Sequence, residues 1–319
     1  MSAAPEIRAV AVLGYGNQGE AHARALRRAG IPVAVGARRE GAGARRAVEH
    51  GFAPTGLAQA MKDADLVAVM LPDEALPPLW PALRPALRPG AAVLFAHGFN
   101  LLYGGLDFPA DSDVVLVSPT APGRVLRLLR ERGERIPAYL AVHHDASGGA
   151  WELAERYAGW LGLAPLWRTT VAEETEVDLF GEQSVLCGGM NALVTAAFET
   201  LTAAGYAPEI AYLECVHQLR YLAELLNERG VAGMREGISG TALFGDLTRG
   251  PRVIGADSRA AMRDILGEIR SGQFAREWAA EAAAGRPKSR SELAAAARHP
   301  IEAARRRALG EPTEGKPPA

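Results

Sequence analysis

The chain has 319 residues, 48% of them hydrophobic and 23% charged, which is the composition of a soluble globular protein large enough for two domains. The formal net charge is −2, and no apolar run reaches the roughly 18 residues of a membrane span, so we expect neither a nucleic-acid nor a membrane partner. The N-terminus lacks a basic segment before its first apolar stretch, and two cysteines in a chain of this length suit a reducing compartment, so we expect a cytoplasmic protein.

The first half of the chain alternates short apolar runs with helical patterns. A helix is expected at 18–30 and another at 151–162. This alternation favours an α/β fold with a doubly wound parallel sheet covered on both faces, so we assign residues 1–168 to a Rossmann dinucleotide-binding domain. The expected strands are residues 7–13, 32–36, 65–71, 91–96, 113–118 and 140–144.

From about residue 170, strand-like runs give way to long helical patterns. We therefore expect a second, all-helical domain at 169–308. The last residues, 309–319, are rich in proline and charge, so we expect a disordered tail. The predicted helices are residues 191–205, 207–230 and 258–285.

A glycine motif, GYGNQG, follows the first strand directly and leads into a helix. Its spacing matches G-x-G-x-x-G, in which one glycine makes the tight turn, one lets the backbone approach a pyrophosphate, and one lets helix and strand pack closely. The helix N-terminus then presents free N–H groups to the phosphates. A purely structural turn is the alternative. The candidate cofactor-binding residues are Gly14, Tyr15, Gly16, Asn17, Gln18 and Gly19.

The end of the second expected strand bears on the type of cofactor. An NAD site usually has an acidic residue at this point, bonded to the ribose. Here Arg38 and Arg39 stand there, and arginine suits a 2′-phosphate through paired, charge-assisted hydrogen bonds. Glu40 follows directly, and a solvated loop is the alternative interpretation. We predict NADPH, with NADH as the alternative cofactor.

Two carboxylates, Asp178 and Glu182, are four residues apart in the segment EVDLFGEQSVLCGG. On a helix this spacing puts both on one face, one turn apart, and like charges so close are costly unless a cation lies between them. Spacing alone favours a solvated helix face over a metal site. The sequence therefore raises the question of a metal site without answering it.

Several long motifs, in order along the chain, resemble those of the ketol-acid reductoisomerase family in its short form. GYGNQGEAHA is similar to the dinucleotide loop of that family, and EETEVDLFGEQSVLCGG to its metal-binding helix. The resemblance covers roughly residues 7 to 308. The other matching motifs are FAHGFN (95–100), FETLTAAGYAPEIAYLEC (198–215), GISGTALFGD (237–246), GQFAREW (272–278) and HPIE (299–302).

The resemblance implies a Rossmann domain followed by an all-helical, knotted domain that pairs with a second subunit as a homodimer or higher homo-oligomer. It also implies NADPH, two Mg²⁺ ions, and migration of an alkyl group in a 2-hydroxy-2-acyl acid before reduction of the resulting 2-keto acid. Asp178 resembles the carboxylate that bridges both ions, and Glu182 a ligand of one of them. By the same resemblance, Glu214 reaches the site from a long helix, Ser239 holds the substrate carboxylate, and His97 is the active-site histidine.

The chain departs from the family where its motifs carry chemistry. The family has PKGPGH where this chain has SPTAPGRV, so Thr120 stands in place of the active-site lysine and Arg124 in place of a histidine. Gln218 replaces a second glutamate four residues after Glu214, and Leu243 replaces another glutamate. Mg²⁺ prefers oxygen ligands, so we still expect it at Asp178 and Glu182. Because one carboxylate and one ammonium are missing, we expect the second ion to bind less tightly, and reduction to one ion or loss of the metal is the alternative. Arg124 is either a replacement cation or a surface residue.

Three functions remain in competition at this point. We favour a reductase built on the reductoisomerase scaffold, which reduces a small keto acid, related carbonyl or imine and has a weakened or lost isomerase step. A true ketol-acid reductoisomerase of branched-chain amino-acid biosynthesis is the first alternative. A non-catalytic protein that binds NADPH is the second.

Overall fold

The computed structural model describes residues 5–311 and divides into two compact units, with the division between Val177 and Asp178. The division falls inside helix α8 (Val171–Gly181). The change of sequence pattern near residue 168 comes before this helix, at the end of the last strand. The two units are described separately.

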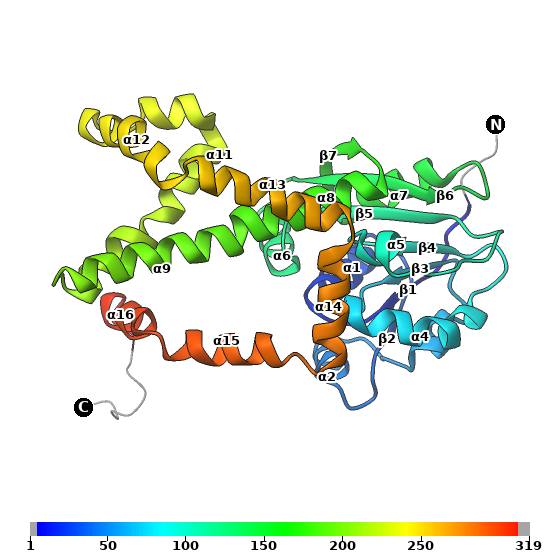
Figure 1. Cartoon of the computed structure of the whole chain (residues 1–319). Helices are drawn as coiled ribbons and strands as arrows, with labels where there is room; N and C mark the ends of the chain where they lie inside the picture. Colours follow the sequence, from blue (N-terminus) through cyan, green and yellow to red (C-terminus); the bar gives the residue numbers. More distant parts are fainter. Residues whose placement is uncertain (1–4, 312–319) are drawn as a thin grey trace. The chain divides into compact units, whose positions relative to one another are not determined.

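Unit 1 is built on a seven-stranded sheet with the order β2-β1-β3-β4-β5-β6-β7 (Figure 1). The first five strands are parallel, as the alternating pattern predicts. They form because each is a short run of mainly β-branched and other apolar residues; β1, β3, β4 and β5 are fully buried, and β2 is buried in its second half. The strands are β1 (Val10–Leu13), β2 (Val33–Gly36), β3 (Leu66–Val69), β4 (Ala92–Phe95), β5 (Val114–Pro119), β6 (Ile136–His144) and β7 (Leu163–Arg168).

Helices cover both faces of the sheet, because successive residues of each strand point to opposite sides. Val10 and Val12 of β1 belong to one buried cluster, whereas Ala11 and Leu13 belong to the other. The first cluster includes residues of α1 (Asn17–Arg28), α2 (Ala42–Glu49), α6 (Gly123–Glu131) and α7 (Ala150–Leu161). The second includes residues of α3 (Leu57–Met61), α4 (Leu76–Leu83) and α5 (Phe99–Tyr103), and the short 3₁₀ turns η1 (Asp73–Ala75) and η2 (Arg84–Ala86) flank α4.

Two features of the sheet differ from the sequence prediction. Strand β6 is antiparallel to β5, whereas the alternating pattern predicts a wholly parallel sheet. The pattern cannot reveal this, because α6 separates the two strands in sequence just as a parallel crossover helix would. Strand β7, which pairs parallel to β6, was not predicted: its sequence LAPLWR contains a proline and is largely exposed, so it lacks an apolar run.

The order of the strands also indicates where on the sheet a ligand would bind. The chain runs from β1 outward to β2 and then returns to the other side of β1 to form β3. The connections that follow β1 and β3 therefore diverge at the carboxyl ends of these strands. In open α/β sheets, ligands bind at such a switch point. The glycine motif lies in the connection that follows β1.

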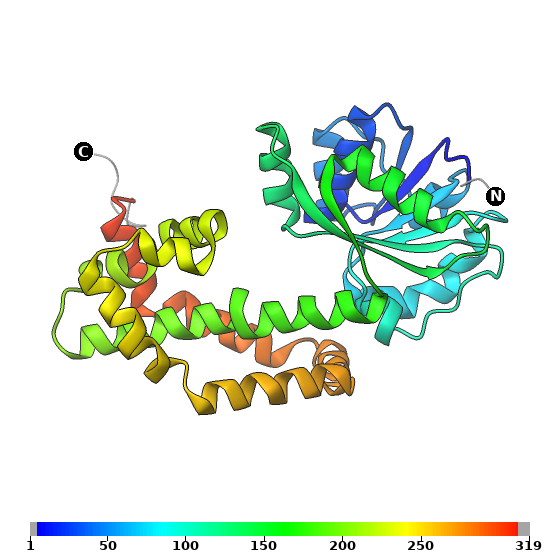
Figure 2. The same ribbon diagram turned by 90° about the horizontal axis from the view of Figure 1, so that it is seen from above.

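Unit 2 consists of helices, as predicted, and the views in Figures 1 and 2 show them from two directions. Two segments are π-helices, η3 (Glu182–Leu186) and η4 (Leu213–His217). The predicted helix at 258–285 is broken at Gly272, whose φ is 71°. The α-helices are α9 (Gly188–Ala203), α10 (Pro208–Tyr212), α11 (Leu219–Glu236), α12 (Gly240–Val253), α13 (Ala256–Arg270), α14 (Gln273–Ala283), α15 (Pro287–Arg298) and α16 (Pro300–Ala308).

A small buried cluster holds the two ends of unit 2 together. Phe198 of α9, Ala211 and Tyr212 of α10, and Ala304 of α16 are its buried members. The C-terminal helix therefore packs against the first helices of the unit. Glu311, in the predicted disordered tail, pairs with Arg305 at 2.6 Å; residues 312–319 lie outside the described residues.

One helical stretch in the described part of the chain, Val171–Ala203, is long and apolar enough to span a membrane by length and composition, although it contains no uninterrupted apolar run of that length. One such helix is weak evidence for a membrane protein, because helices that a soluble protein covers by packing pass the same test. Only 6% of its apolar window is buried within this chain.

Candidate active site

The three glycines of the GYGNQG motif are required for three different reasons. Gly14 has a φ of +93°, and a Cβ there would lie 2.5 Å from the carbonyl oxygen of Met70. A Cβ on Gly19 would lie 2.0 Å from the carbonyl oxygen of Gly14. Around Gly16 there is open space, so a ligand can approach its backbone. These are the turn, the close packing and the open approach of a pyrophosphate-binding loop.

The other residues of the motif support the loop from behind or border it. The Tyr15 side chain is buried, and its hydroxyl lies 3.1 Å from Nδ1 of His50. The Gln18 amide donates to the carbonyl oxygen of Ala121 at 3.2 Å. Asn17 begins α1 and is exposed. Of the predicted cofactor residues, Tyr15 and Gln18 therefore use their side chains to anchor the loop to neighbouring segments of the protein.

Arg38 and Arg39 lie in the turn between β2 and α2, and both side chains are exposed. The turn is closed by a hydrogen bond from the Gly41 amide to the Arg38 carbonyl oxygen. Neither guanidinium has a hydrogen bond or ion pair with any residue between 5 and 311. Arg45 instead donates to the backbone carbonyl of Glu40. Two unpaired guanidinium groups therefore stand at the end of β2, where a ribose 2′-phosphate is bound in this fold.

His97 lies next to a buried carboxylate that sequence reasoning missed. Glu174 of α8 has a fully buried side chain, and its Oε1 lies 3.7 Å from Nδ1 of His97. Its Oε2 accepts the backbone N–H of Gly98 at 3.0 Å, whereas Oε1 is buried without a hydrogen-bond partner among the described residues. The 3.7 Å contact is longer than a hydrogen bond, but the charge of a buried carboxylate so near favours a proton on Nδ1 of the ring.

Gly98 makes this arrangement sterically feasible. A Cβ at Gly98 would lie 2.1 Å from Oγ1 of Thr175 and 2.8 Å from Oε2 of Glu174. Because Gly98 has no side chain, there is room beside it for the carboxylate of Glu174. The sequence signal for Glu174 is its position four residues before Asp178, which continues the same helical spacing of carboxylates.

The segment that departs from the family lies between β5 and α6. The Thr120 hydroxyl and backbone N–H both donate to the Pro137 carbonyl of β6, at 3.0 Å each. Thr120 is therefore bonded to its own sheet. Arg124 lies exposed in the first turn of α6 and has no hydrogen bond or ion pair with the described residues. A cation is unfavourable at a helix N-terminus, so Arg124 is not placed there for helix stability.

In unit 2, Asp178 and Glu182 lie at the end of α8 and the start of η3. A π-helix inserts one residue into a turn, is rare, and occurs often at functional sites. The glycine pair that follows fits this geometry: a Cβ on Gly188 or Gly189 would lie 2.2 or 2.0 Å from the carbonyl oxygen five residues earlier. The glycines in VLCGG are thus a sequence signal of the π-helix.

The second π-helix, η4, contains Glu214. The Gln218 amide nitrogen donates to Oε2 of Glu214 at 2.6 Å. Cys215 lies beside them, and burial, followed by the charge of Glu214, raises the pKa of its thiol. Glu214 therefore bonds directly to the glutamine that replaces the second glutamate of the family.

Ser239 is the N-cap of α12, and its hydroxyl accepts the Ala242 backbone N–H at 3.2 Å. This is the usual capping geometry, and the hydroxyl hydrogen stays available to a ligand. Leu243, in the next turn, is half-buried.

The described residues contain no group of three or more histidine, cysteine or acidic side chains that could hold a metal ion. In unit 2, Asp178, Glu182 and Glu214 carry the type of oxygen donor that Mg²⁺ prefers, but the described residues do not gather them into such a group. The donor chemistry therefore fits the ion, and the sequence has already lost one carboxylate of the set at Gln218.

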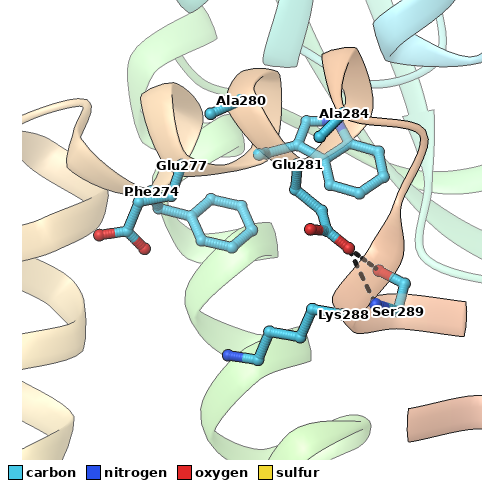
Figure 3. A pocket seen from close by; sticks show the side chains of 8 residues that line it. Phe274, Glu277, Ala280, Glu281, Ala284, Lys288 and Ser289 are labelled. Atoms are coloured by element: carbon cyan, nitrogen blue, oxygen red, sulfur yellow. Dashed lines mark hydrogen bonds between the residues drawn. The ribbon is translucent and has the colours of Figure 1, made fainter. Parts of the chain in front are cut away.

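Figure 3 shows a pocket of about 510 Å³ between α14 and α15 that contains none of the predicted site residues. Glu281 accepts the Ser289 backbone N–H at 2.8 Å and its hydroxyl at 3.1 Å, which fixes the start of α15. The lining residues are Phe274, Glu277, Trp278, Ala280, Glu281, Ala284, Lys288 and Ser289.

These features define the class of protein: a nucleotide-dependent oxidoreductase with a Rossmann sheet and a helical domain whose acidic residues lie at π-helices. Residues 6–165 match the family model described as acetohydroxy acid isomeroreductase, NADPH-binding domain, and residues 171–309 match ketol-acid reductoisomerase, C-terminal domain. The chain therefore belongs to the ketol-acid reductoisomerase family and is an NAD(P)H-dependent oxidoreductase, as the sequence motifs predict.

Solved structures agree with this assignment. An NADH-preferring ketol-acid reductoisomerase from an uncultured archean is 35% identical, with a TM-score of 0.90 over 93% of this chain and 92% of that one. A semialdehyde dehydrogenase NAD-binding protein from Cupriavidus necator is 20% identical, with a TM-score of 0.63 over 83% and 99%. A pyrroline-5-carboxylate reductase from Coxiella burnetii is 16% identical, with a TM-score of 0.57 over 83% and 98%. The last two share the fold alone.

Proposed function

We propose that this chain is an NADPH-dependent reductase of a small keto acid, related carbonyl or imine, in which the alkyl-migration step of the family is weakened or lost. The observation that carries the proposal is the 2.6 Å hydrogen bond between Gln218 and Glu214. Two carboxylates four residues apart on a helix repel each other and favour a cation between them. A carboxylate that accepts a hydrogen bond from a neutral amide is not repelled by it. A cation between the two side chains would therefore relieve less repulsion, and a metal ion would bind less tightly.

Thr120 supports the same conclusion. The hydroxyl replaces an ammonium group of the family, and it is already bonded to the carbonyl of Pro137. A neutral, occupied hydroxyl does not offset negative charge on a substrate. Alkyl migration depends on a charged network around an alkoxide, whereas hydride transfer to a carbonyl or imine needs a positioned cofactor and a proton donor.

The chain retains what hydride transfer requires. The glycine loop binds the pyrophosphate through backbone N–H groups, and Arg38 and Arg39 bind the 2′-phosphate of NADPH. His97, which lies beside the buried carboxylate of Glu174, is the proton donor in this proposal. Mg²⁺ held by Asp178 and Glu182 would polarise a substrate oxygen.

The cofactor preference is a separate part of the proposal. The two unpaired guanidinium groups favour NADPH. The 35% identical relative is NADH-preferring, so membership of the family does not decide the preference. Arg38 and Arg39 are the residues on which it depends here.

We further propose that the chain acts as a homodimer or higher homo-oligomer in the cytoplasm. The apolar stretch Val171–Ala203 is exposed within one chain, at Leu186, Met190 and Leu193 among others, and apolar area of this kind is normally covered by a partner. Both cysteines are free, which suits a reducing compartment.

A true ketol-acid reductoisomerase is the second candidate, and a specific observation favours it. Asp178, Glu182 and Glu214 are all retained, and both π-helices that carry glutamates are formed. If these three carboxylates suffice for two ions, the isomerase step survives.

Oxidation of NADPH, followed by absorbance, separates the candidates. The purified protein is assayed with acetolactate, with a panel of 2-keto acids and with cyclic imines, each across a Mg²⁺ titration. The proposal predicts reduction of one of the simpler carbonyls or imines and little turnover of acetolactate. Efficient turnover of acetolactate favours the second candidate, and no turnover of any substrate indicates a protein that binds NADPH without catalysis.

A further inference from the structure

Glu20 is a buried carboxylate in the first turns of α1, directly behind the glycine loop. Only 5% of the surface of Glu20 is exposed to solvent. Its Oε1 lies 3.2 Å from Nε of Arg127 on α6 and 3.1 Å from Nη1 of Arg24 on its own helix. A carboxylate this deeply buried is stable only with such partners, so Glu20 and Arg127 hold α1 and α6 together at this point.

The segment that Arg127 anchors lies against the glycine loop itself. A Cβ on Gly123, the first residue of α6, would lie 2.2 Å from the carbonyl oxygen of Asn17. The Gln18 amide donates to the carbonyl oxygen of Ala121 in the turn before α6. The start of α6 therefore forms one wall of the loop, and a shift of α6 along α1 would move the loop residues Asn17 and Gln18.

A second connection runs from Glu20 to the loop through aromatic side chains. Nδ1 of His50 lies 3.1 Å from the hydroxyl of Tyr15 and 3.8 Å from Oε1 of Glu20. Burial, followed by the charge of Glu20, raises the pKa of Tyr15 to about 12, so the phenol stays neutral and shares this hydrogen bond with the imidazole. The position of Tyr15 fixes Gly14 and Gly16 on either side of it.

We infer that Glu20 is a positioning residue for the cofactor, which holds the start of α6 and the ring of Tyr15 in the places that keep the glycine loop in its binding conformation. The inference rests on NAD(P)H binding by this loop. It does not depend on which substrate is reduced or on whether the isomerase step survives.

The chain offers a matched control, because α1 and α6 are linked a second time at their other ends. There Oε1 of Glu131 lies 3.5 Å from Nη2 of Arg28, and both of these side chains are about half exposed. The same oxygen lies 3.9 Å from Nη2 of Arg24, so the control leaves the Glu20–Arg127 contact in place but shares Arg24 with it. Glu131→Gln removes the same charge from the same pair of helices, away from the loop. Exposed pairs of this kind contribute little to stability.

The test measures the Kd of NADPH by calorimetry, without substrate, together with the Tm of each variant. We expect Glu20→Gln and Arg127→Met each to raise the Kd about tenfold, the order of effect of one lost hydrogen bond to a charged group. The double variant should show no further rise, because both changes remove one link. Glu131→Gln should stay within about twofold of the wild type.

A lower Tm with an unchanged Kd in Glu20→Gln would overturn the inference, because it would show that Glu20 only stabilises the fold. If Glu20→Gln does not fold, Arg127→Lys, which keeps the charge but loses the Nε donor, is measured instead. A Kd that rises at least threefold supports the inference, and an unchanged Kd overturns it. Since no substrate is present, failure here is distinct from failure of the proposed reaction.

Discussion

Replacing Glu174 by glutamine removes one charge from a fully buried side chain without changing its size. The glutamine oxygen can still accept the Gly98 N–H, which now lies 3.0 Å from Oε2. Its amide nitrogen then faces His97, where Oε1 now lies 3.7 Å from Nδ1. Nδ1 then faces an amide donor instead of a carboxylate, and this change favours the tautomer with its proton on Nε2.

The expected size of the effect follows from the change in hydrogen bonding. A hydrogen bond to a charged group contributes about 1.5–3 kcal/mol and a neutral one about 0.5–1.5 kcal/mol, so the Gly98 contact loses about 1 kcal/mol. The wrong tautomer removes a proton donor or acceptor from the reaction, which typically contributes about 10²–10⁴-fold. We expect kcat to fall at least about 100-fold.

The assay compares kcat and KM of Glu174→Gln with those of Glu173→Gln, on the substrate that the wild type reduces best. Glu173 is the preceding residue, is exposed, and lies on the same helix, so it controls for a change of charge at this helix. The Kd of NADPH should be unchanged in both variants. Wild-type kcat in Glu174→Gln would refute the proposed role of the His97–Glu174 pair.

Arg38→Ala or Arg39→Ala should narrow the preference for NADPH over NADH, and a tighter Kd for NADH than for NADPH in the wild type, measured by calorimetry, would contradict the predicted cofactor. Thr120→Lys combined with Gln218→Glu should tighten Mg²⁺ binding and raise isomerase turnover above wild type, and more so than either single change, because each restores one charged group of the family's pattern. Burial lowers the pKa of His22 from 6.5 to about 3, so the folded state excludes a proton that the unfolded state binds. The free energy of unfolding should therefore decrease as the pH falls below about 6.5, by about 2 kcal/mol at pH 5 from this group alone. Urea denaturation should show this loss in the wild type and a smaller one in His22→Gln. In sedimentation, an isolated folded monomer at micromolar concentration would contradict the proposed oligomer.

The parts of the fold that could be predicted are those with strong local signals. Strands β1 to β5 are short, mainly apolar runs, all buried except for the first half of β2, and the alternation with helices follows from their parallel pairing. The direction of β6 depends on the end of the sheet at which the chain leaves α6 and enters the strand, and this is a tertiary property. Strand β7 is half exposed and contains Pro165, so its formation depends on pairing with β6 more than on its own residues.

The candidate site divides in the same way. The glycine loop could be predicted because φ and close contacts at Gly14 and Gly19 exclude other residues. The partnership of Glu174 with His97 could not, because the two residues are far apart in sequence and only the fold brings them together. The contact between Gln218 and Glu214 follows from helical spacing, but the π-helix at η4 does not, since one inserted residue barely alters the hydrophobic pattern.

The steady-state turnover of acetolactate by the wild-type protein tests the central claim most directly. It is measured with saturating NADPH across a Mg²⁺ titration, beside the turnover of the 2-keto acids and imines. The loss of two charged contacts, at Thr120 and Gln218, each of about 1.5–3 kcal/mol, predicts an isomerase step slower by roughly two to four orders of magnitude. A reductase activity on a simpler carbonyl or imine should remain. Acetolactate turnover of about 1–10³ per second would contradict the account and identify the chain as a standard ketol-acid reductoisomerase.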